Sequence, residues 1–340
     1  MGRINALVRV VVFCAAAVMA SMPKASAEDM VKVAVARGGA WETAAAELGQ
    51  KAGIFNKNGI VLDFLNVDTA EEAKESVISS RADIGLGVSV MAAMQAYDYG
   101  APIRIIGANL AGSPNYWYVL QSSPIRTYKD MAGRSVGYEK NGSSSQFDAI
   151  DFTKKFRIKA KLVPTGDEAP TLEQLKSGQV DVGWAAPPFG FKEIEEGTIR
   201  AVARATDVPN IQKKTVSVII ANAGFLQQHK DVAVRFLRAY RESLDWMYSD
   251  PTALRSYAEF AGESEAVARR LRAFFPKPML APDTIVGVSA IGKDADALGY
   301  LRKPLSRRQL RELIQIPMSP ADQARCFGGG GAECPAGILP

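Results

Sequence analysis

The chain has 340 residues, with 41 Lys and Arg against 36 Asp and Glu and a formal net charge of +5. Residues 1–27 contain three of the bases and no acid, so the rest of the chain carries +2, an ordinary charge for a soluble protein that gives no support to nucleic-acid binding. After these residues, no segment reaches the roughly 18 uninterrupted apolar residues of a membrane-spanning helix, which argues against an integral membrane protein.

The N-terminus has the pattern of an export signal. Arg3 and Arg9 supply positive charge, residues 10–20 are mainly apolar, and residues 25–27 (Ala-Ser-Ala) fit a small-x-small cleavage site. We therefore expect cleavage after Ala27 and a soluble protein in the periplasm. The 313 residues that follow are enough for two lobes of conventional size.

Short apolar runs then alternate with helical patterns, an order typical of mixed, mainly parallel α/β sheets with helices on both faces. Strands are expected at Val31–Ala36, Ile60–Val67, Asp83–Gly87, Ile103–Asn109, Tyr116–Gln121, Ser135–Tyr138, Ala160–Pro164, Val180–Trp184, Ile199–Arg204 and Val216–Asn222. Helices are expected at Glu42–Ala52, Thr69–Ser79, Ser89–Tyr97, Ser143–Phe156, Thr171–Lys176 and Asp231–Tyr248, and the rest of the chain after these is also helical.

One eight-residue pattern occurs twice, 98 residues apart. Ser79-Ser80-Arg81-Ala82-Asp83-Ile84-Gly85-Leu86 matches Ser177-Gly178-Gln179-Val180-Asp181-Val182-Gly183-Trp184. Each copy has the pattern of a helix end, a tight turn and a short buried strand, in which the Gly lets another group approach the backbone. Two related α/β halves predict a bilobed protein with a cleft between the lobes.

The duplication also predicts how the chain is divided. The first lobe is expected to hold residues 28–121 and 215–325, including the C-terminal helices, and the second lobe residues 122–214. The crossings between lobes are expected at Gln121–Pro124 and Val216–Ala221. Residues 326–340 form a Gly-rich tail.

The strongest ligand candidate is a serine cluster at a helix start. In sheets of this type, ligands bind outside the carboxyl ends of strands, where loops lead into helix N-termini. Gly142 is followed by Ser143, Ser144 and Ser145, which present backbone N–H groups, hydroxyls and the positive end of a helix dipole. This combination suits an oxyanion such as sulfonate, phosphate, nitrate or carboxylate. Helix capping, which requires a single Ser, is the alternative.

Other strand ends supply further candidates. After the first strand, Gly39 lets the backbone approach a ligand and Trp41 is either an apolar wall of the site or a packing residue. Ser89, after the first repeated strand, is either a ligand contact or a helix cap. The complete set of ligand-binding candidates is Gly39, Trp41, Glu42, Ser89, Asn109, Gly142, Ser143, Ser144, Ser145, Trp184 and Pro187.

Motifs of common enzyme classes are missing from the sequence. It has no Gly-x-Ser-x-Gly elbow, no Gly-Lys-Ser/Thr phosphate loop and no Gly-x-Gly-x-x-Gly. The single histidine, His229, lies in a polar run typical of an exposed helix start. We therefore expect no enzyme and no cofactor.

Cys326 and Cys334 are too few ligands for zinc, and in an oxidising compartment a local disulfide between them is expected.

Four motifs resemble those of one protein family. They lie at Ala52–Ile60 (AGIFNKNGI), Arg81–Gly85 (RADIG), Tyr128–Gly137 (YKDMAGRSVG) and Gly178–Gly183 (GQVDVG). The chain resembles the solute-binding proteins of ABC importers, in the SsuA/THI5-like (NMT1-like) group. That group contains the aliphatic-sulfonate, taurine and nitrate binders and the binders of thiamine pyrimidine precursors. The resemblance covers roughly Val31 to Pro209.

The resemblance implies a bilobed periplasmic binding protein of type II, with ligand contacts on Trp41, Ser89, Ser143, Ser144, Ser145 and Trp184. It also implies a monomer that captures a small, anionic organic solute by lobe closure and delivers it to an inner-membrane ABC permease and its ATPase. A thiamine pyrimidine precursor or another small aromatic solute is an alternative ligand, and a secreted enzyme on the same fold is an alternative of a different class. The fungal pyrimidine synthase that shares the fold is a poor match, because the chain lacks a cysteine-rich motif and keeps its histidine away from the expected cleft.

Overall fold

The structure is a computed structural model that describes residues 28–36, 38–141 and 143–318. The expected export signal, Arg37, Gly142 and the two tail cysteines lie outside these ranges. Within these ranges, no helix is both long enough and apolar enough to span a bilayer.

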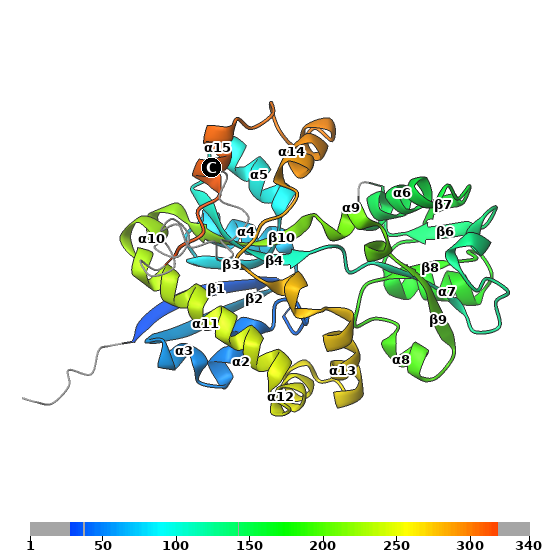
Figure 1. The fold of residues 1–340 in the computed structure, drawn as a ribbon, viewed down its shortest axis with the longest axis horizontal. Helices are drawn as coiled ribbons and strands as arrows, with labels where there is room; N and C mark the ends of the chain where they lie inside the picture. The colour runs from blue at the N-terminus through cyan, green and yellow to red at the C-terminus, as the bar shows by residue number, and fades with distance from the viewer. Residues whose placement is uncertain (1–27, 37, 142, 319–340) are drawn as a thin grey trace, which may run out of the picture.

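The first lobe is built on a five-stranded sheet (Figure 1). Its strands are β1 (Asp29–Ala36), β2 (Ile60–Val67), β3 (Ile84–Ser89), β4 (Ile103–Ala111) and β10 (Thr215–Asn222), in the order β2-β1-β3-β10-β4. Strand β1 pairs in parallel with β2 and β3, whereas β10 runs antiparallel to β3 and β4. The sheet is therefore mixed, as the sequence predicts.

Both faces of this sheet are buried because alternate residues of β1 enter different cores. Val31, Val33 and Val35 belong to a cluster with the helices of one face, and Ala34 and Ala36 to a cluster with those of the other. The first face is covered by α2 (Ala45–Lys51) and α11 (Lys230–Ser249). Helix α12 (Thr252–Ala261) packs on the outside of these two helices, and α13 (Glu265–Phe274) packs on α12. The second face is covered by α4 (Ala70–Ile78), α5 (Val90–Asp98), α14 (Val288–Ala297) and α15 (Arg307–Leu313).

The second lobe repeats this strand order on a smaller scale. Its strands are β5 (Tyr116–Leu120), β6 (Ser135–Tyr138), β7 (Lys161–Pro164), β8 (Gly183–Ala185) and β9 (Ile199–Arg204). A three-stranded sheet β8-β5-β9 and the parallel pair β6-β7 are joined by a parallel bridge between Val136 and Val182. The resulting order, β7-β6-β8-β5-β9, matches that of the first lobe strand for strand, with the same parallel and antiparallel pairings. Its main helices are α6 (Ser144–Phe156) and α7 (Glu168–Lys176).

The eight-residue repeat occupies equivalent positions in the two sheets. Asp83 Oδ2 accepts a hydrogen bond from the backbone N–H of Lys32 at 2.9 Å, and Asp181 Oδ2 accepts one from the N–H of Ser135 at 2.8 Å. The repeated Asp thus links the start of β3 to β1 in the first lobe and the start of β8 to β6 in the second. The repeated Gly leaves no room for a Cβ in either lobe: the Cβ would lie 2.7 Å from the Tyr118 ring on β5 at Gly183, and 2.9 Å from a methyl of Val77 on α4 at Gly85.

The crossings between lobes differ from the expected ones. Strand β5 pairs with β8 and β9, so it belongs to the second sheet although residues up to 121 were expected in the first lobe. Residues 216–221, expected as a crossing, lie within β10 of the first sheet. The chain crosses instead at residues 112–115 and 205–214. The aromatic run at Tyr116 indicates a strand, but its pattern does not say which sheet the strand joins.

The strand registers place the carboxyl edges of the two sheets toward each other. Four residues separate Ala111, at the end of β4, from Tyr116, which pairs with Ala185 at the end of β8. The return crossing starts at Arg204, the end of β9, and enters β10 at Thr215, which pairs with Ala111. Both crossings therefore join the carboxyl edge of one sheet to that of the other, as Figure 1 allows the reader to follow.

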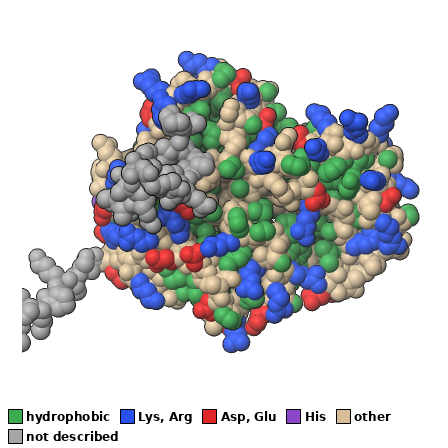
Figure 2. Space-filling view, in the orientation of Figure 1, with side chains coloured by type: hydrophobic (Ala, Val, Ile, Leu, Met, Phe, Trp, Pro, Cys, Tyr) green, Lys and Arg blue, Asp and Glu red, His purple; other side chains and the backbone are tan. Residues whose placement is uncertain are grey.

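The surface charge is mixed. On the face shown in Figure 2, Lys and Arg side chains are spread over both lobes and are interspersed with acidic ones.

Short segments complete the fold, namely α3 (Ile54–Lys57), α8 (Phe191–Glu195), α9 (Pro209–Gln212), α10 (Ala223–Gln228) and the 3-10 turns Tyr128–Met131, Ala205–Asp207 and Lys277–Leu280.

Candidate functional site

The facing edges gather most of the residues that the sequence singles out. In the first lobe, the loop after β1 carries Gly39, Trp41 and Glu42, Ser89 ends β3, and Asn109 lies near the end of β4. In the second lobe, Ser143, Ser144 and Ser145 follow β6, and Trp184 and Pro187 lie at the end of β8. Gly142 is outside the described residues.

The serine cluster begins α6, and each of its three hydroxyls has a polar partner within the protein. Ser143 Oγ is the N-cap and accepts from the N–H of Gln146 at 3.3 Å. Ser145 is fully buried, and its Oγ accepts from the N–H of Glu139 at 2.9 Å and lies 2.9 Å from Ser143 Oγ. Ser144 is exposed. Capping and loop closure therefore account for Ser143 and Ser145, whereas Ser144 is exposed and its Oγ accepts, among the described residues, only a long hydrogen bond of 3.4 Å, from Asn115 Nδ2.

A buried carboxylate of α6 anchors the first crossing, a feature that the sequence analysis missed. Asp148 Oδ2 accepts from Ser113 Oγ at 2.5 Å and from Asn115 Nδ2 at 2.7 Å. Asn115 Nδ2 also lies 3.4 Å from Ser144 Oγ. Burial raises the pKa of the Asp148 carboxyl to about 6, although the hydrogen bonds from Ser113 and Asn115 oppose the shift. One acid thus ties the segment between the lobes to the helix that starts at the serine cluster.

In the first lobe, Trp41 is a packing residue. Only 1% of its surface is exposed, its Nε1 donates to Tyr248 Oη at 3.1 Å, and its ring meets that of Tyr257 edge-on at 4.7 Å. Tyr257 Oη in turn donates to the carbonyl of Gly39 at 2.8 Å, and Gly39 has a φ of +89° that favours glycine. The loop after β1 is therefore held rigidly against α11 and α12.

Ser89 and Asn109 mainly support this first-lobe edge. Ser89 is the N-cap of α5, with its Oγ 3.5 Å from the N–H of Ala92. Asn109 is fully buried and donates to the carbonyl of Glu42 at 2.6 Å. Its Oδ1 is buried without a hydrogen-bond partner among the described residues. Glu42 itself is half-buried.

Trp184 and Pro187 are also largely buried in the second lobe. Trp184 is 5% exposed, and its Nε1 donates to the carbonyl of Gly166 at 3.1 Å. Pro187 is buried and joined to Pro188 by a cis peptide bond. Neither tryptophan offers an open aromatic face in this structure.

Phe274 of the first lobe bridges the two lobes. Its ring packs against Tyr116 at 6.1 Å and Phe191 at 5.8 Å, both in the second lobe. The guanidinium of Arg204 lies 4.7 Å from the centre of the same ring. These contacts join α13 to the second sheet beside the crossings, so the lobes touch through an apolar contact as well as through the chain.

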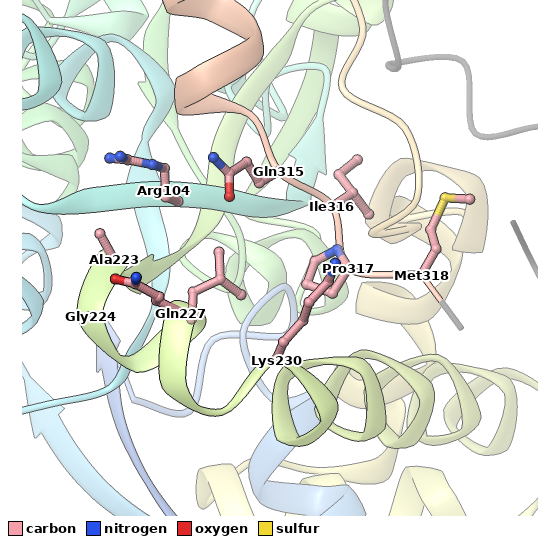
Figure 3. Close-up of a pocket in the computed structure, with 10 residues that line it drawn as sticks. Arg104, Ala223, Gly224, Gln227, Lys230, Gln315, Ile316, Pro317 and Met318 are labelled. Carbon is pink, nitrogen blue, oxygen red and sulfur yellow. The ribbon is translucent and has the colours of Figure 1, made fainter. Parts of the chain in front are cut away.

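Several recesses open on the first lobe. A cavity of about 570 Å³ lies between β4, α10 and the segment after α15 (Figure 3), with Arg104, Gln227, Lys230 and Gln315 in its lining. A second, of about 450 Å³, lies beside the loop after β1 and is lined by Gly38, Gly39, Glu47, Asn66, Val67, Asp68, Phe260 and Ala261. Of the sequence-predicted site residues, Gly39 lines this second cavity.

His229, the single histidine of the sequence, lies where α10 meets α11. It is exposed and packs against Phe225 with ring centres 5.4 Å apart. Its position is on the first lobe and away from the crossings. The exposed helix start expected from its polar neighbours is confirmed.

Known proteins share both sequence and fold with this chain. The family model described as NMT1/THI5 like matches residues 43–254. The 4-amino-5-hydroxymethyl-2-methylpyrimidine phosphate synthase of Uromyces fabae is 24% identical over 227 residues, which are 63% of this chain and 64% of the synthase. The match thus spans just under two thirds of the length of that relative.

Solved structures with the same fold include binding proteins and an enzyme. The periplasmic aliphatic sulphonate binding protein SsuA from Escherichia coli superposes with a TM-score of 0.67 at 16% identity, over 83% of this chain and 96% of SsuA. The desulfurization enzyme DSZB superposes with a TM-score of 0.57 at 16% identity, over 83% of this chain and 95% of DSZB. The bilobed, mixed α/β architecture expected from the sequence is confirmed.

These comparisons correct the expectation that the chain is not an enzyme. The fungal pyrimidine synthases, regarded as a poor match from the sequence, are relatives that the chain resembles along 63% of its length. The missing catalytic motifs belong to other enzyme classes, so their absence does not separate this chain from the synthases. The family model covers more than half of the chain, and the chain belongs to the NMT1/THI5-like family.

Proposed function

We propose that the protein binds a small organic solute with an anionic group between the facing edges of its two sheets. The lobes would close on the solute by bending at residues 112–115 and 205–214. In this proposal the protein is exported to the periplasm, acts as a monomer and delivers its solute to an inner-membrane ABC permease and its ATPase. The similarity in fold to periplasmic sulphonate binding proteins supports it.

The observation that carries the proposal is the route of the two crossings. Each crossing joins the carboxyl edges of the two sheets, so the strand ends that bind ligands in α/β proteins meet at a common boundary. A solute held by both edges makes more contacts in the closed form than in the open form. It would therefore shift the population toward the closed form, which the permease would recognise.

The anionic group of the solute would lie at the start of α6. Ser144 supplies an exposed hydroxyl there, and the helix dipole favours negative charge. Ser143 and Ser145 would act indirectly, since their hydroxyls already hold the loop in place. Trp41 and Trp184 would stiffen the walls of the site from beneath.

Calorimetric titration with an alkanesulfonate, taurine, nitrate and an aminopyrimidine tests this proposal. We expect saturable binding of at least one anion and a loss of about 1.5–3 kcal/mol of its binding free energy in Ser144→Ala. Ser123→Ala provides a matched control, because Ser123 is a second-lobe serine whose hydroxyl contacts the backbone of Ile125, away from α6. If no compound of the panel binds, solute capture is refuted; equal affinity in Ser144→Ala refutes the anion position alone.

A second candidate function is the binding or the synthesis of a pyrimidine. The names of the curated relatives favour it, because they are synthases of a pyrimidine phosphate. Incubation of the full chain with aminopyrimidines and their phosphate esters, followed by mass spectrometry, distinguishes the two candidates. Turnover or tight pyrimidine binding without anion binding would replace the first candidate by the second.

A further inference from the structure

The cavity of about 450 Å³ beside the loop after β1, here named the Glu47 recess, contains a buried acid. Glu47 lies on α2 and is only 5% exposed. Its side chain receives a hydrogen bond from Asn66, but its second oxygen, Oε2, is buried without a hydrogen-bond partner among the described residues. A buried acceptor left without a partner costs about 1–3 kcal/mol, and more when it is charged. The recess therefore offers a strong acceptor that the described protein does not use.

Lys51, whose charge lowers the pKa of this acid, does not form an ion pair with it. Lys51 follows Glu47 by one helical turn, a spacing at which Glu and Lys commonly form an ion pair. Instead, the Lys51 ammonium lies 4.5 Å from the centre of the Phe260 ring. No ion pair of Glu47 occurs within the described ranges. Lys51 therefore lies against Phe260, and Glu47, which lines the cavity, has no ion pair with it.

The rest of the lining defines the shape and charge of the recess. Asn66 Oδ1 lies 3.2 Å from the position of a Cβ at Gly38, so the glycine makes room for the amide that holds Glu47. Asp68 adds a second acid at the exposed rim, and Phe260 with Ala261 forms an apolar wall. An occupant must accordingly combine a positively charged hydrogen-bond donor with a short apolar portion.

We propose that the Glu47 recess binds the primary ammonium group of a small aliphatic amine, with an N–H donated to Glu47 Oε2. The apolar portion of the amine lies against Phe260, and Asp68 attracts the positive charge at the rim. A metal ion fits less well, because the described residues form no group of three or more His, Cys, Asp or Glu that could hold one. The recess is formed by first-lobe residues only, so its occupancy does not depend on solute capture between the lobes.

The protonation state of Glu47 makes the affinity for the amine depend on pH. Burial is the main cause that raises the pKa of the Glu47 carboxyl, while the Asn66 hydrogen bond and the Lys51 charge lower it. An ammonium pairs with the ionised carboxylate. Binding must therefore strengthen as the pH rises through the pKa of Glu47, while an alkylamine of pKa near 10 stays protonated.

The experiment is calorimetric titration of the full chain with n-butylammonium chloride between pH 5 and 8. We expect saturable binding that strengthens with pH and weakens about ten- to a hundredfold in Glu47→Gln. Asp63→Asn is the matched control, since Asp63 is an exposed acid on β2 outside the recess, and it should bind as the wild type does. Butyltrimethylammonium chloride, which lacks an N–H, and 1-butanol, which lacks the charge, should each bind at least tenfold more weakly.

Three outcomes would overturn the proposal. They are the absence of saturable binding by n-butylammonium, equal affinity in Glu47→Gln, and equal affinity for butyltrimethylammonium. The first would mean that water alone satisfies Glu47. A thermal melt of ligand-free Glu47→Gln confirms that the variant is folded, because removal of an unpaired buried charge should leave its melting temperature equal to or above that of the wild type.

Discussion

The two lobes share one strand order, but the loop after β1 in the first lobe differs in character from the equivalent loop after β6 in the second. In the first lobe this loop carries Trp41, which is locked between aromatic side chains of α11 and α12. In the second lobe the equivalent loop carries the serine cluster, with Ser144 exposed at the start of α6. The duplicated plan fixes where the loops lie, and the residues on them decide whether a loop is a rigid wall or a polar surface.

The largest effect is expected when the rigid wall is removed. Trp41→Ala should lower the free energy of unfolding by about 3–5 kcal/mol, because it deletes a fully buried aromatic side chain and leaves a cavity beside Tyr257. Urea denaturation measures the change, and Trp246→Ala on the more exposed side of α11 is a control with a smaller expected loss. A Trp41→Ala protein as stable as the wild type but deficient in solute binding would show that Trp41 is a ligand wall instead.

The repeated glycines compare the two sheets directly. A Cβ at Gly183 would lie 2.7 Å from the ring of Tyr118, and one at Gly85 would lie 2.9 Å from a methyl of Val77. Gly183→Ala should cost about 1–3 kcal/mol of unfolding free energy, since the buried ring cannot move aside. Gly85→Ala should cost less, because its added Cβ would meet one atom closer than 3.0 Å, whereas the Cβ at Gly183 would meet two, both of the Tyr118 ring. Urea denaturation of the two variants side by side checks the order, and a larger loss at Gly85 would contradict it.

Local signals in the sequence were enough to predict many elements of both lobes. The ranges of β2, β6 and β9 agree with the expected strands, and Ser89 and Ser143 are N-caps, the alternative that the sequence left open beside ligand contact. Such features depend on neighbours in the chain, so alternation and capping patterns reveal them.

Features that depend on distant partners were not predicted. Strand β5 was assigned to the wrong lobe because an aromatic run does not identify its partner strands. Asp148 lies in the middle of a polar helix, and only the fold brings Ser113 and Asn115 to it. Glu47 interrupts a run of small and apolar residues on α2. Because such a run packs against the core, the acid within it is buried as well. This signal was weak, and the sequence analysis did not use it.

Asp148 makes the junction between the lobes sensitive to pH. Its pKa of about 6 in the folded chain lies above the value of 3.8 that is usual for the unfolded chain, so the folded state binds the proton more tightly. The protonated Asp148 carboxyl therefore stabilises the folded state fully below pH 4, and this contribution is lost as the pH rises through 6. Relative to Asp148→Asn, the wild type should lose about 1–3 kcal/mol between pH 4 and pH 7. Thermal melts across this range measure the difference, with the exposed second-lobe acid variant Asp167→Asn as the control; parallel pH curves for wild type and Asp148→Asn would disprove it.

The smallest expected effect concerns the repeated acids. The Asp181 carboxylate accepts from both the N–H and the Oγ of Ser135, whereas within the described residues the Asp83 carboxylate accepts from the N–H of Lys32 alone. Each such bond contributes about 0.5–1.5 kcal/mol, so Asp181→Ala should destabilise the protein by roughly 1 kcal/mol more than Asp83→Ala. Ser135→Ala removes one of the two bonds at Asp181 and should bring the two Asp variants close together when each is measured in that background. If the difference between them persists without the Ser135 hydroxyl, it comes from another contact of Asp181, such as its 3.6 Å ion pair with Arg134.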